Sequence, residues 1–158
     1  IDRLGAAIFE RWKKLDILVA NAGILGKLTP LGHIEPKTWD EVMAVNVTAN
    51  FRLIRAMDPL LRAAPAGRAV FMTSGAARSC PAYWGAYSVS KAALEVRANC
   101  FSPGPTRTKM RSAAMPGEDP KSLPSPEEVA LRLMPLCRPD FTGNGGIYAH
   151  GAEGLHAQ

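Results

Sequence analysis

The alternation of apolar and polar positions predicts a chain in which amphipathic helices and short strands follow one another. Residues 3–14 carry apolar side chains at helical spacing, and residues 16–20 form a short, nearly all-apolar run. A run of this kind is typical of a parallel strand that is buried on both faces. Further apolar runs predict strands over 68–73 and 96–101, and a short fourth strand over 145–149.

Helices are expected between these strands. One is predicted from about residue 39 to 62, and another from about 82 to 94. A polar, Pro-rich stretch that reaches Pro126 is expected to form a mobile loop or lid, and a last helix begins there with Ser125 as its N-cap. Strands that alternate with helices in this way indicate an α/β domain with a parallel sheet.

Composition and charge exclude several classes of partner. The 158 residues suffice for one domain with a core, and 47% hydrophobic and 21% charged residues are typical of a globular protein. The net charge of +5 comes from scattered basic residues without interleaved aromatic ones, so we expect no nucleic-acid partner. No apolar run reaches ~18 residues and no signal peptide opens the chain, so we expect no membrane partner and a cytoplasmic location.

Cysteine and histidine spacing predicts no metal site. Cys80, Cys100 and Cys137 contain no C-x-x-C pair, and the three histidines are isolated in the sequence. Zinc sites need closely spaced ligands, and a disulfide framework needs an even set of cysteines. The sequence therefore points to neither.

The segment Tyr87-Ser88-Val89-Ser90-Lys91 contains a tyrosine and a lysine four residues apart. On a helix this spacing places both side chains on one face, about one turn apart. A free tyrosine titrates near pH ~10, and an ammonium group within ~4–6 Å lowers that pKa, so the phenol can exchange a proton with a substrate oxygen. Alone the motif is weak, because a solvated helix face can carry the same two residues.

Polar or Gly-rich residues stand at the ends of three predicted strands. They are Asn21-Ala22-Gly23, Ser74 and Pro103-Gly104. Ligands of open α/β sheets bind beyond the carboxyl ends of the strands, so these residues and the Tyr87 helix are expected to face one crevice. Taken singly, each could be a turn, a helix cap or a chain break.

The order of these motifs resembles that of the short-chain dehydrogenase/reductase family. That family has Asn-Ala-Gly after a strand, an Asn in the next helix, a strand-end Ser, Tyr-x-x-x-Lys thirteen residues later, and then Pro-Gly. The matching residues are Asn21-Ala22-Gly23, Asn46, Ser74, Tyr87 with Lys91, and Pro103-Gly104. The resemblance extends from residue 3 to about 151 and implies a Rossmann-like, doubly wound parallel sheet.

The resemblance implies a catalytic role for four residues. Tyr87 would be the general acid in reduction and the base in oxidation, and Lys91 would lower its pKa and bind the nicotinamide ribose. Ser74 would orient and polarise the substrate oxygen. Asn46 would hold a water that connects Lys91 with solvent.

The same resemblance implies NAD or NADP as the cofactor. Asn21, Ala22 and Gly23 would line its adenosine side. The strand-end Pro103-Gly104 would lie against it too, together with Tyr87 and Lys91. The backbone at Thr106 and the side chain of Thr108 would meet the carboxamide. Hydride chemistry belongs to such a cofactor, while the protein supplies orientation and electrostatics.

The chain departs from the family pattern in two places. The Gly-rich phosphate loop of the family, T-G-x-x-x-G-x-G, does not occur in the 158 residues, nor does the residue that selects NAD or NADP. We therefore expect residues 1–158 to form a single, partial domain that represents mainly the C-terminal half of the fold. Between Leu94 and Val96 a helix would run directly into a strand, so a segment of roughly ten to twenty residues is expected to be missing there. Unresolved residues and a true truncation both remain open explanations.

Three functional interpretations follow. The leading one is an NAD(P)-dependent oxidoreductase that interconverts an alcohol and a carbonyl compound. A truncated, non-catalytic assembly or binding module is the alternative. An epimerase or dehydratase of the extended family is less favoured, because the tail after Pro126 is short. The family's pairing of long helices implies a homodimer or homotetramer through 39–62 and 82–94, and the apolar loop at 76–84 favours a hydrophobic small-molecule substrate.

Overall fold

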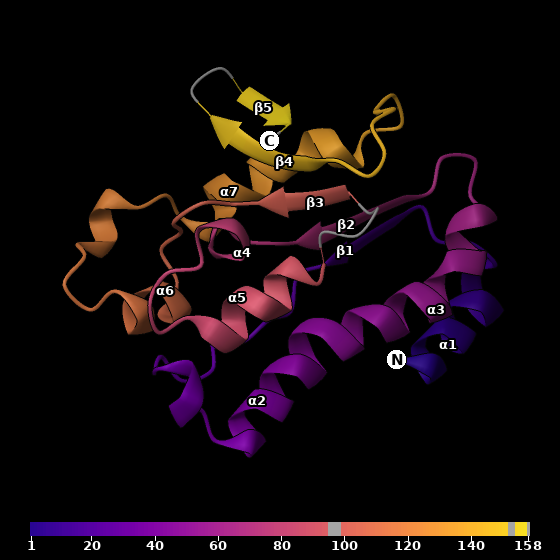
Figure 1. Ribbon diagram of the computed structural model, residues 1–158. Helices are drawn as coiled ribbons and strands as arrows, with labels where there is room; N and C mark the ends of the chain where they lie inside the picture. Colours follow the sequence, from indigo (N-terminus) through magenta and orange to yellow (C-terminus); the bar gives the residue numbers. More distant parts are fainter. Residues whose placement is uncertain (95–98, 152–153, 158) are drawn as a thin grey trace.

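A five-stranded sheet forms the centre of the computed structural model, which describes residues 1–94, 99–151 and 154–157 (Figure 1). The strands lie in the order in which they occur in the chain. The first three neighbouring pairs are parallel, and the last pair is antiparallel. The strands are β1 (Ile17–Ala20), β2 (Arg68–Met72), β3 (Asn99–Ser102), β4 (Ile147–Gly151) and β5 (Gly154–Ala157).

Helical segments connect these strands. The α-helices are α1 (Asp2–Trp12), α2 (Pro36–Met43), α3 (Ala49–Arg62), α4 (Ala76–Ser79), α5 (Gly85–Ala92), α6 (Lys109–Ala114) and α7 (Pro126–Leu133). A π-helical turn, η2 (Ala44–Thr48), joins α2 to α3, and 3-10 turns lie at η1 (Leu31–His33), η3 (Pro120–Ser122) and η4 (Met134–Cys137). Within the described ranges, none of the helices has the length and apolar character needed to cross a membrane.

The core has two halves, one on each face of the sheet. Val70 and Phe101 belong to a cluster with residues of α7 and η4, whereas Phe71 and Cys100 belong to a second cluster against which α3 packs. Successive residues of a strand point to opposite faces, so each strand supplies both clusters. This arrangement confirms the predicted α/β fold with a Rossmann-like, doubly wound sheet.

The predicted helix over 39–62 is present but is not a uniform α-helix. It begins at Pro36 and passes through the π turn at Ala44–Thr48 before it continues to Arg62. The side chain of Asn50, at the start of α3, donates to the main-chain oxygen of Asn46 in the π turn (2.6 Å). π turns are frequent at functional sites, and this one carries a predicted site residue.

The prediction that the first strand is buried on both faces is wrong for the described structure. Ile17 and Val19 are 44% and 39% exposed, and only Ala20 of β1 is buried. In the described ranges β1 is paired with β2 alone. The face that carries Ile17 and Val19 therefore remains open to solvent.

Helix α1 confirms the helix predicted over residues 3–14, but most of its apolar side chains are exposed. It contacts α3 through Gly5, where an added Cβ would come within 3.0 Å of the Ala56 oxygen. Three apolar side chains of the helix, Leu4, Phe9 and Trp12, are exposed instead of packed. α1 therefore packs on α3 through the close approach at Gly5 and not through a broad apolar stripe.

The segment between Gly104 and Pro126 is more regular than the predicted loop. It contains α6 and η3, and Arg111 forms a bidentate ion pair with Glu118 at 2.6 and 2.7 Å. The predicted cap of the following helix is confirmed: Ser125 Oγ accepts from the Glu128 amide, and Glu128 returns the contact to the Ser125 amide.

Other boundaries were predicted less well. The helix expected over 82–94 spans Gly85–Ala92, and the separate helix α4 precedes it. The last predicted strand corresponds to β4, but the antiparallel β5 was not foreseen. The expected break between Leu94 and Val96, and the first half of the strand at 96–101, fall on residues 95–98, outside the described residues.

The α7 side of the core yields the first testable prediction. Leu136 is fully buried in the cluster with Val70 and Phe101, whereas Leu131 is 72% exposed on the preceding helix. Leu136→Ala should lower the free energy of unfolding in urea by about 2–5 kcal/mol, because it removes packed atoms and leaves a cavity. The matched variant Leu131→Ala should change it by less than about 0.5 kcal/mol. Equal midpoints for the two variants would contradict this packing.

Candidate active site

Four predicted site residues come together beyond the carboxyl ends of β1 and β2. Asn46 lies on the π turn, Ser74 follows β2, and Tyr87 and Lys91 lie on α5. Gly23 follows β1 and approaches both Asn46 and Lys91. Parallel strands end at the same edge of the sheet, so the topology itself gathers these segments.

Lys91 is buried at the centre of this cluster. Its Nζ donates to the main-chain oxygen of Met72, the last residue of β2, at 2.7 Å. A Cβ at position 23 would lie 3.2 Å from Nζ, so glycine there permits the close approach. Burial lowers the pKa of Lys91 to about 8, and nearby Cys100 partly opposes this change.

Tyr87 is 8% exposed, and its side chain forms a hydrogen bond with that of Ser74. The edge of its ring meets Trp84 at 5.7 Å between centroids, and the Lys91 ammonium lies 5.7 Å from the ring centroid. The sequence suggests a Tyr87 pKa lowered by Lys91. The structure gives the opposite direction: burial raises the pKa of the phenol, and the Ser74 hydrogen bond offsets only part of that effect.

The side chain of Asn46 is fully buried and fully used as a donor. Nδ2 donates to the Ile24 oxygen and to Ser90 Oγ, both at 2.9 Å, and Oδ1 accepts from the Ile24 amide at 2.8 Å. These bonds connect the π turn with the segment after β1 and with α5. Asn46 thus positions the other residues, and any water that it holds would have to use its remaining acceptor capacity.

Among the described residues, the Ser74 hydroxyl has contacts with Ala76 and Tyr87. Its Oγ accepts from the Ala76 amide at 3.2 Å, at the start of α4, and its hydroxyl also bonds Tyr87. The interpretation of a strand-end serine as a helix cap and the interpretation as a site residue are therefore compatible. The cap fixes the hydroxyl that faces Tyr87.

The remaining predicted cofactor residues lie along the same edge of the sheet. Asn21 and Ala22 follow β1 directly and are exposed, and Pro103 follows β3. Gly104 has a φ of +73°, a left-handed value that suits glycine, and the Thr106 hydroxyl donates to its oxygen at 3.2 Å.

Thr108 is committed to a structural contact in this structure. Its Oγ1 accepts from the Arg111 amide at 3.1 Å and so caps α6. In this cap the Thr108 hydroxyl is only an acceptor. Its hydrogen could still be donated to a carboxamide, as the prediction requires.

Sequence reasoning missed three participants in the cluster. Two act through the main chain, Met72 and Ile24, and leave no side-chain signal. The third is Ser90, whose Oγ donates to the Tyr87 oxygen at 2.8 Å and accepts from Asn46. Its position three residues after Tyr87 could have indicated this role, because residues at that spacing share a helix face.

The cluster suits proton transfer. The Ser74 hydroxyl is hydrogen-bonded to the Tyr87 phenol, the Lys91 ammonium lies 5.7 Å from the centre of the Tyr87 ring, and the lysine has a pKa near the neutral range. Among the described residues, no group of three or more His, Cys, Asp or Glu side chains is arranged to hold a metal ion. The absence of a side chain at Gly23 lets the Lys91 ammonium and the Asn46 amide pack directly against the backbone after β1.

The lowered pKa of Lys91 predicts a rise of stability with pH. Between about pH 8 and 10 the unfolded chain keeps the lysine proton that the folded chain has lost, so unfolding becomes less favourable as pH rises, by up to about 3 kcal/mol. Above pH 10 the raised pKa of Tyr87 has the opposite effect, and stability should fall as pH rises.

Urea unfolding curves at pH 7.5, 9 and 10 measure this dependence. Lys91→Met should remove the rise, whereas the exposed-lysine control Lys109→Met should retain it; parallel slopes in both variants would contradict the assignment.

The Asn46 hydrogen bonds predict a specific loss. Asn46→Asp keeps the shape of the side chain but cannot donate to Ile24 and Ser90, so the free energy of unfolding should fall by about 2–4 kcal/mol. Thermal or urea unfolding measures it, with Asn144→Asp at an exposed position as the control. An Asn46→Asp variant as stable as the control would refute the positioning role.

Comparison with known proteins identifies relatives across most of the chain. The family model described as "short chain dehydrogenase" matches residues 1–119. The oxidoreductase YciK of Escherichia coli strain K12 is 40% identical over 147 residues, which are 85% of this chain and 57% of YciK. The chain thus spans little more than half the length of this relative.

Solved structures agree with this assignment. The structure of yciK from Escherichia coli has a TM-score of 0.82 at 36% identity and covers 94% of this chain and 66% of its own. A short chain dehydrogenase of Escherichia coli CFT073, complexed with NADPH, has a TM-score of 0.78 at 38% identity and covers 86% of this chain and 61% of its own. The fold, the order of the motifs and these similarities together show that the chain belongs to the short-chain dehydrogenase/reductase family of oxidoreductases.

Proposed function

We propose that this chain carries the catalytic residues of an NAD(P)-dependent oxidoreductase that interconverts an alcohol and a carbonyl compound. The observation that supports this most is the buried Tyr87 phenol, hydrogen-bonded to Ser74 and one helical turn from the Lys91 ammonium. A phenol that served only in packing would not need both polar neighbours in a buried position.

In carbonyl reduction, Tyr87 gives its proton to the substrate oxygen. The Ser74 hydroxyl donates to the same oxygen and stabilises the negative charge that develops on it. In alcohol oxidation the proton returns to Tyr87. The raised pKa of the phenol favours its protonated form at neutral pH, which is the form needed for reduction.

Lys91 restores the proton. With a pKa of about 8, it can release and regain a proton near neutral pH without a large free-energy change. Asn46 keeps it in place indirectly, because its bonds to Ile24 and Ser90 hold the segment after β1 and α5 at a fixed separation. Disruption of those bonds would move the lysine relative to Tyr87.

A nicotinamide cofactor, NAD or NADP, would supply the hydride when bound. The Lys91 ammonium would bind its ribose, and Asn21, Ala22, Gly23, Pro103 and Gly104 border the same edge of the sheet. Thr106 and Thr108 follow on the segment that leads into α6 and would meet the carboxamide. Relatives complexed with NADP and NADPH support this cofactor class.

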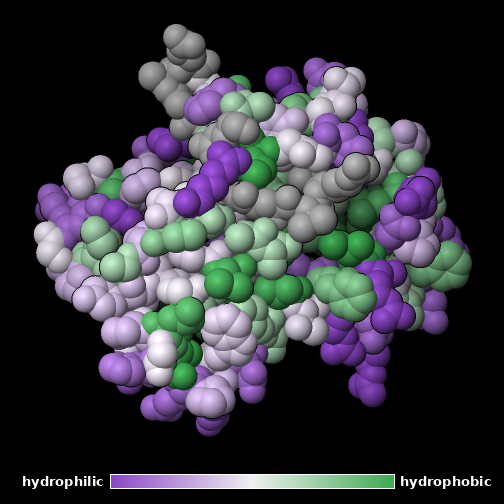
Figure 2. All heavy atoms as spheres, in the orientation of Figure 1, coloured by the Kyte–Doolittle hydropathy of each residue, from purple (hydrophilic) through white to green (hydrophobic). Residues whose placement is uncertain are grey.

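The proposal concerns one domain, residues 1–158, which spans about 57–66% of the relatives compared above. It includes a homo-oligomer, because exposed apolar side chains lie on α3 and α5: Phe51, Ile54 and Val89. Figure 2 shows hydrophobic side chains gathered across the middle of the face on which these helices lie. The cytoplasm as compartment depends on the sequence alone.

Replacement of the phenol tests the function. Tyr87→Phe should lower kcat/KM for carbonyl reduction by about 10²–10⁴-fold, measured as NADPH or NADH oxidation with a panel of hydrophobic ketones, because it removes the proton donor and keeps the ring. Tyr148→Phe is the matched control, since Tyr148 lies on β4 and packs against Phe141, outside the predicted site; it should retain most of the activity.

Three results would speak against the proposal. Equal turnover by Tyr87→Phe and the parent protein would exclude Tyr87 as the acid. Cofactor binding without turnover of any ketone or alcohol would favour the non-catalytic binding module. Conversion of a sugar-like substrate without net cofactor consumption would favour an epimerase.

A further inference from the structure

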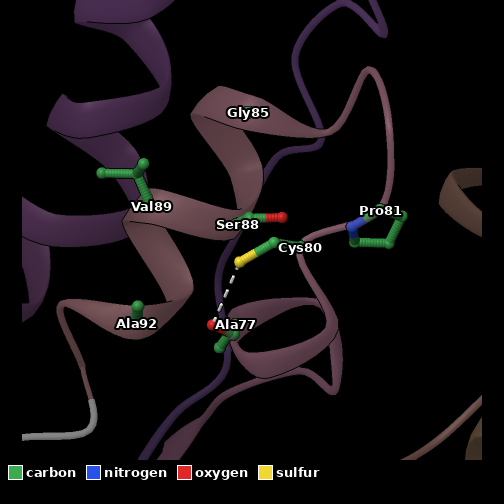
Figure 3. A pocket seen from close by; sticks show the side chains of 7 residues that line it. All are labelled: Ala77, Cys80, Pro81, Gly85, Ser88, Val89 and Ala92. Carbon is green, nitrogen blue, oxygen red and sulfur yellow. Dashed lines mark hydrogen bonds between the residues drawn. The ribbon is translucent and has the colours of Figure 1, made fainter.

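Two features adjoin the predicted site without a role in the proposed proton transfer. One is a pocket of about 240 Å³ between α4 and α5, lined by Cys80, Ser88 and Val89 among others (Figure 3). Val89 belongs to the apolar surface of the proposed homo-oligomer, so this pocket lies on that surface. The other feature is the segment that leaves the sheet after β3, passes through α6 and ends at α7 (Figure 1).

Residues 107–124 of this segment, named the arm here, form a loop that is closed at two levels. At its base, the Arg107 amide donates to the Pro124 oxygen at 2.9 Å. At its middle, the Arg111 guanidinium donates twice to the Glu118 carboxylate, at 2.6 and 2.7 Å. Because both levels are joined, neither limb of the arm can move far without the other.

The Arg111–Glu118 pair differs from an ordinary surface ion pair. Its side chains are 23% and 26% exposed, whereas those of Arg62 and Asp58 on α3 are 79% and 50% exposed. Water and salt screen exposed pairs, but a bidentate arginine–carboxylate pair of low exposure keeps a defined geometry. The Arg111 hydrogen bonds also lower the pKa of the Glu118 carboxyl, so this group is charged at neutral pH.

The same arginine contacts Thr108. The Arg111 amide donates to Thr108 Oγ1 at 3.1 Å, and the Ser112 amide donates to the Thr108 main-chain oxygen at 3.0 Å. Arg111 thus bonds Thr108 through its main chain and Glu118 through its side chain. Since Oγ1 already accepts from Arg111, the position of Arg111 limits the directions in which the Thr108 hydroxyl can donate its hydrogen.

We propose that Arg111 and Glu118 are positioning residues for the nicotinamide end of the cofactor. The ion pair holds the first turn of α6 in place, and this turn orients the hydroxyl of Thr108, its N-cap. The inference rests on the proposed function, in which Thr108 meets the carboxamide. Arg111 and Glu118 act on the cofactor through Thr108 and not by contact with the reacting atoms.

The first measurement needs no cofactor. Trypsin cleaves after lysine and arginine, and the arm contains Lys109, Arg111 and Lys121. Glu118→Gln leaves these sites intact but removes the charge that holds Arg111, so trypsin should cleave the arm several-fold faster, with the fragments identified by mass spectrometry. The matched control is Glu127→Gln, an exposed carboxylate in the first turn of α7, outside the arm; it should keep the parent rate.

The second measurement separates positioning of the carboxamide from a general structural role. Calorimetry gives the Kd of NADPH and of 2′-phospho-ADP-ribose, which lacks the nicotinamide ring and its carboxamide; NADH and ADP-ribose form the corresponding pair. Glu118→Gln should raise the Kd of the complete cofactor about three- to tenfold and leave that of the fragment unchanged. In a Thr108→Val background, which lacks the hydroxyl, Glu118→Gln should have little further effect.

A charge swap provides the rescue. Arg111→Glu and Glu118→Arg each place like charges side by side and should weaken cofactor binding, whereas the double variant should recover most of it.

The proposal would be overturned by parent-like cleavage of Glu118→Gln, by faster cleavage with an unchanged Kd, or by an equal loss of affinity for cofactor and fragment. If the parent chain bound neither NADPH nor NADH, the proposed function itself would fail and this inference with it.

Discussion

The amide of Asn46 is the contact on which the arrangement of the site depends. It accepts from the main-chain amide of Ile24, after β1, and donates to the main-chain oxygen of the same residue. It also donates to Ser90 Oγ on α5, and its side chain is fully buried. A buried amide that loses a partner costs more than the bond gains when present, so the three segments are strongly held to one geometry. Tyr87 and Lys91 take their positions from that geometry.

Burial has a larger effect than charge on the electrostatics of this site. The motif alone indicates an ammonium group that lowers the pKa of a phenol. In the folded chain both groups are desolvated: the pKa of Lys91 falls to about 8 and that of Tyr87 rises. Each shift favours the neutral form of its group, and the Met72 oxygen supplies the lysine with a partner in place of water. The result is a site where a proton can move without the separation of strong charges.

Much of the fold could be predicted because its signals are local. The apolar run of β2, the Ser125 cap and the tyrosine–lysine spacing each depend on a few neighbouring residues. The exposure of Ile17 could not be predicted, because it depends on which strand lies beside β1. The contact partners of Asn46 were also hidden, since two of them are main-chain atoms. The roles assigned to the site residues remain predictions.

The π turn at Ala44–Thr48 allows the continuous helical segment from α2 to α3 to pack on different neighbours at its two ends. α2 packs on α5, whereas α3 packs on β1 and α1. A π turn holds one residue more than an α turn, which shifts the angular phase of the two halves by about 100°. That shift lets each half present its own apolar side to a different neighbour. Loss of a single residue from this turn would restore a regular helix and turn α2 away from α5, so the length of this segment is constrained together with the identity of Asn46.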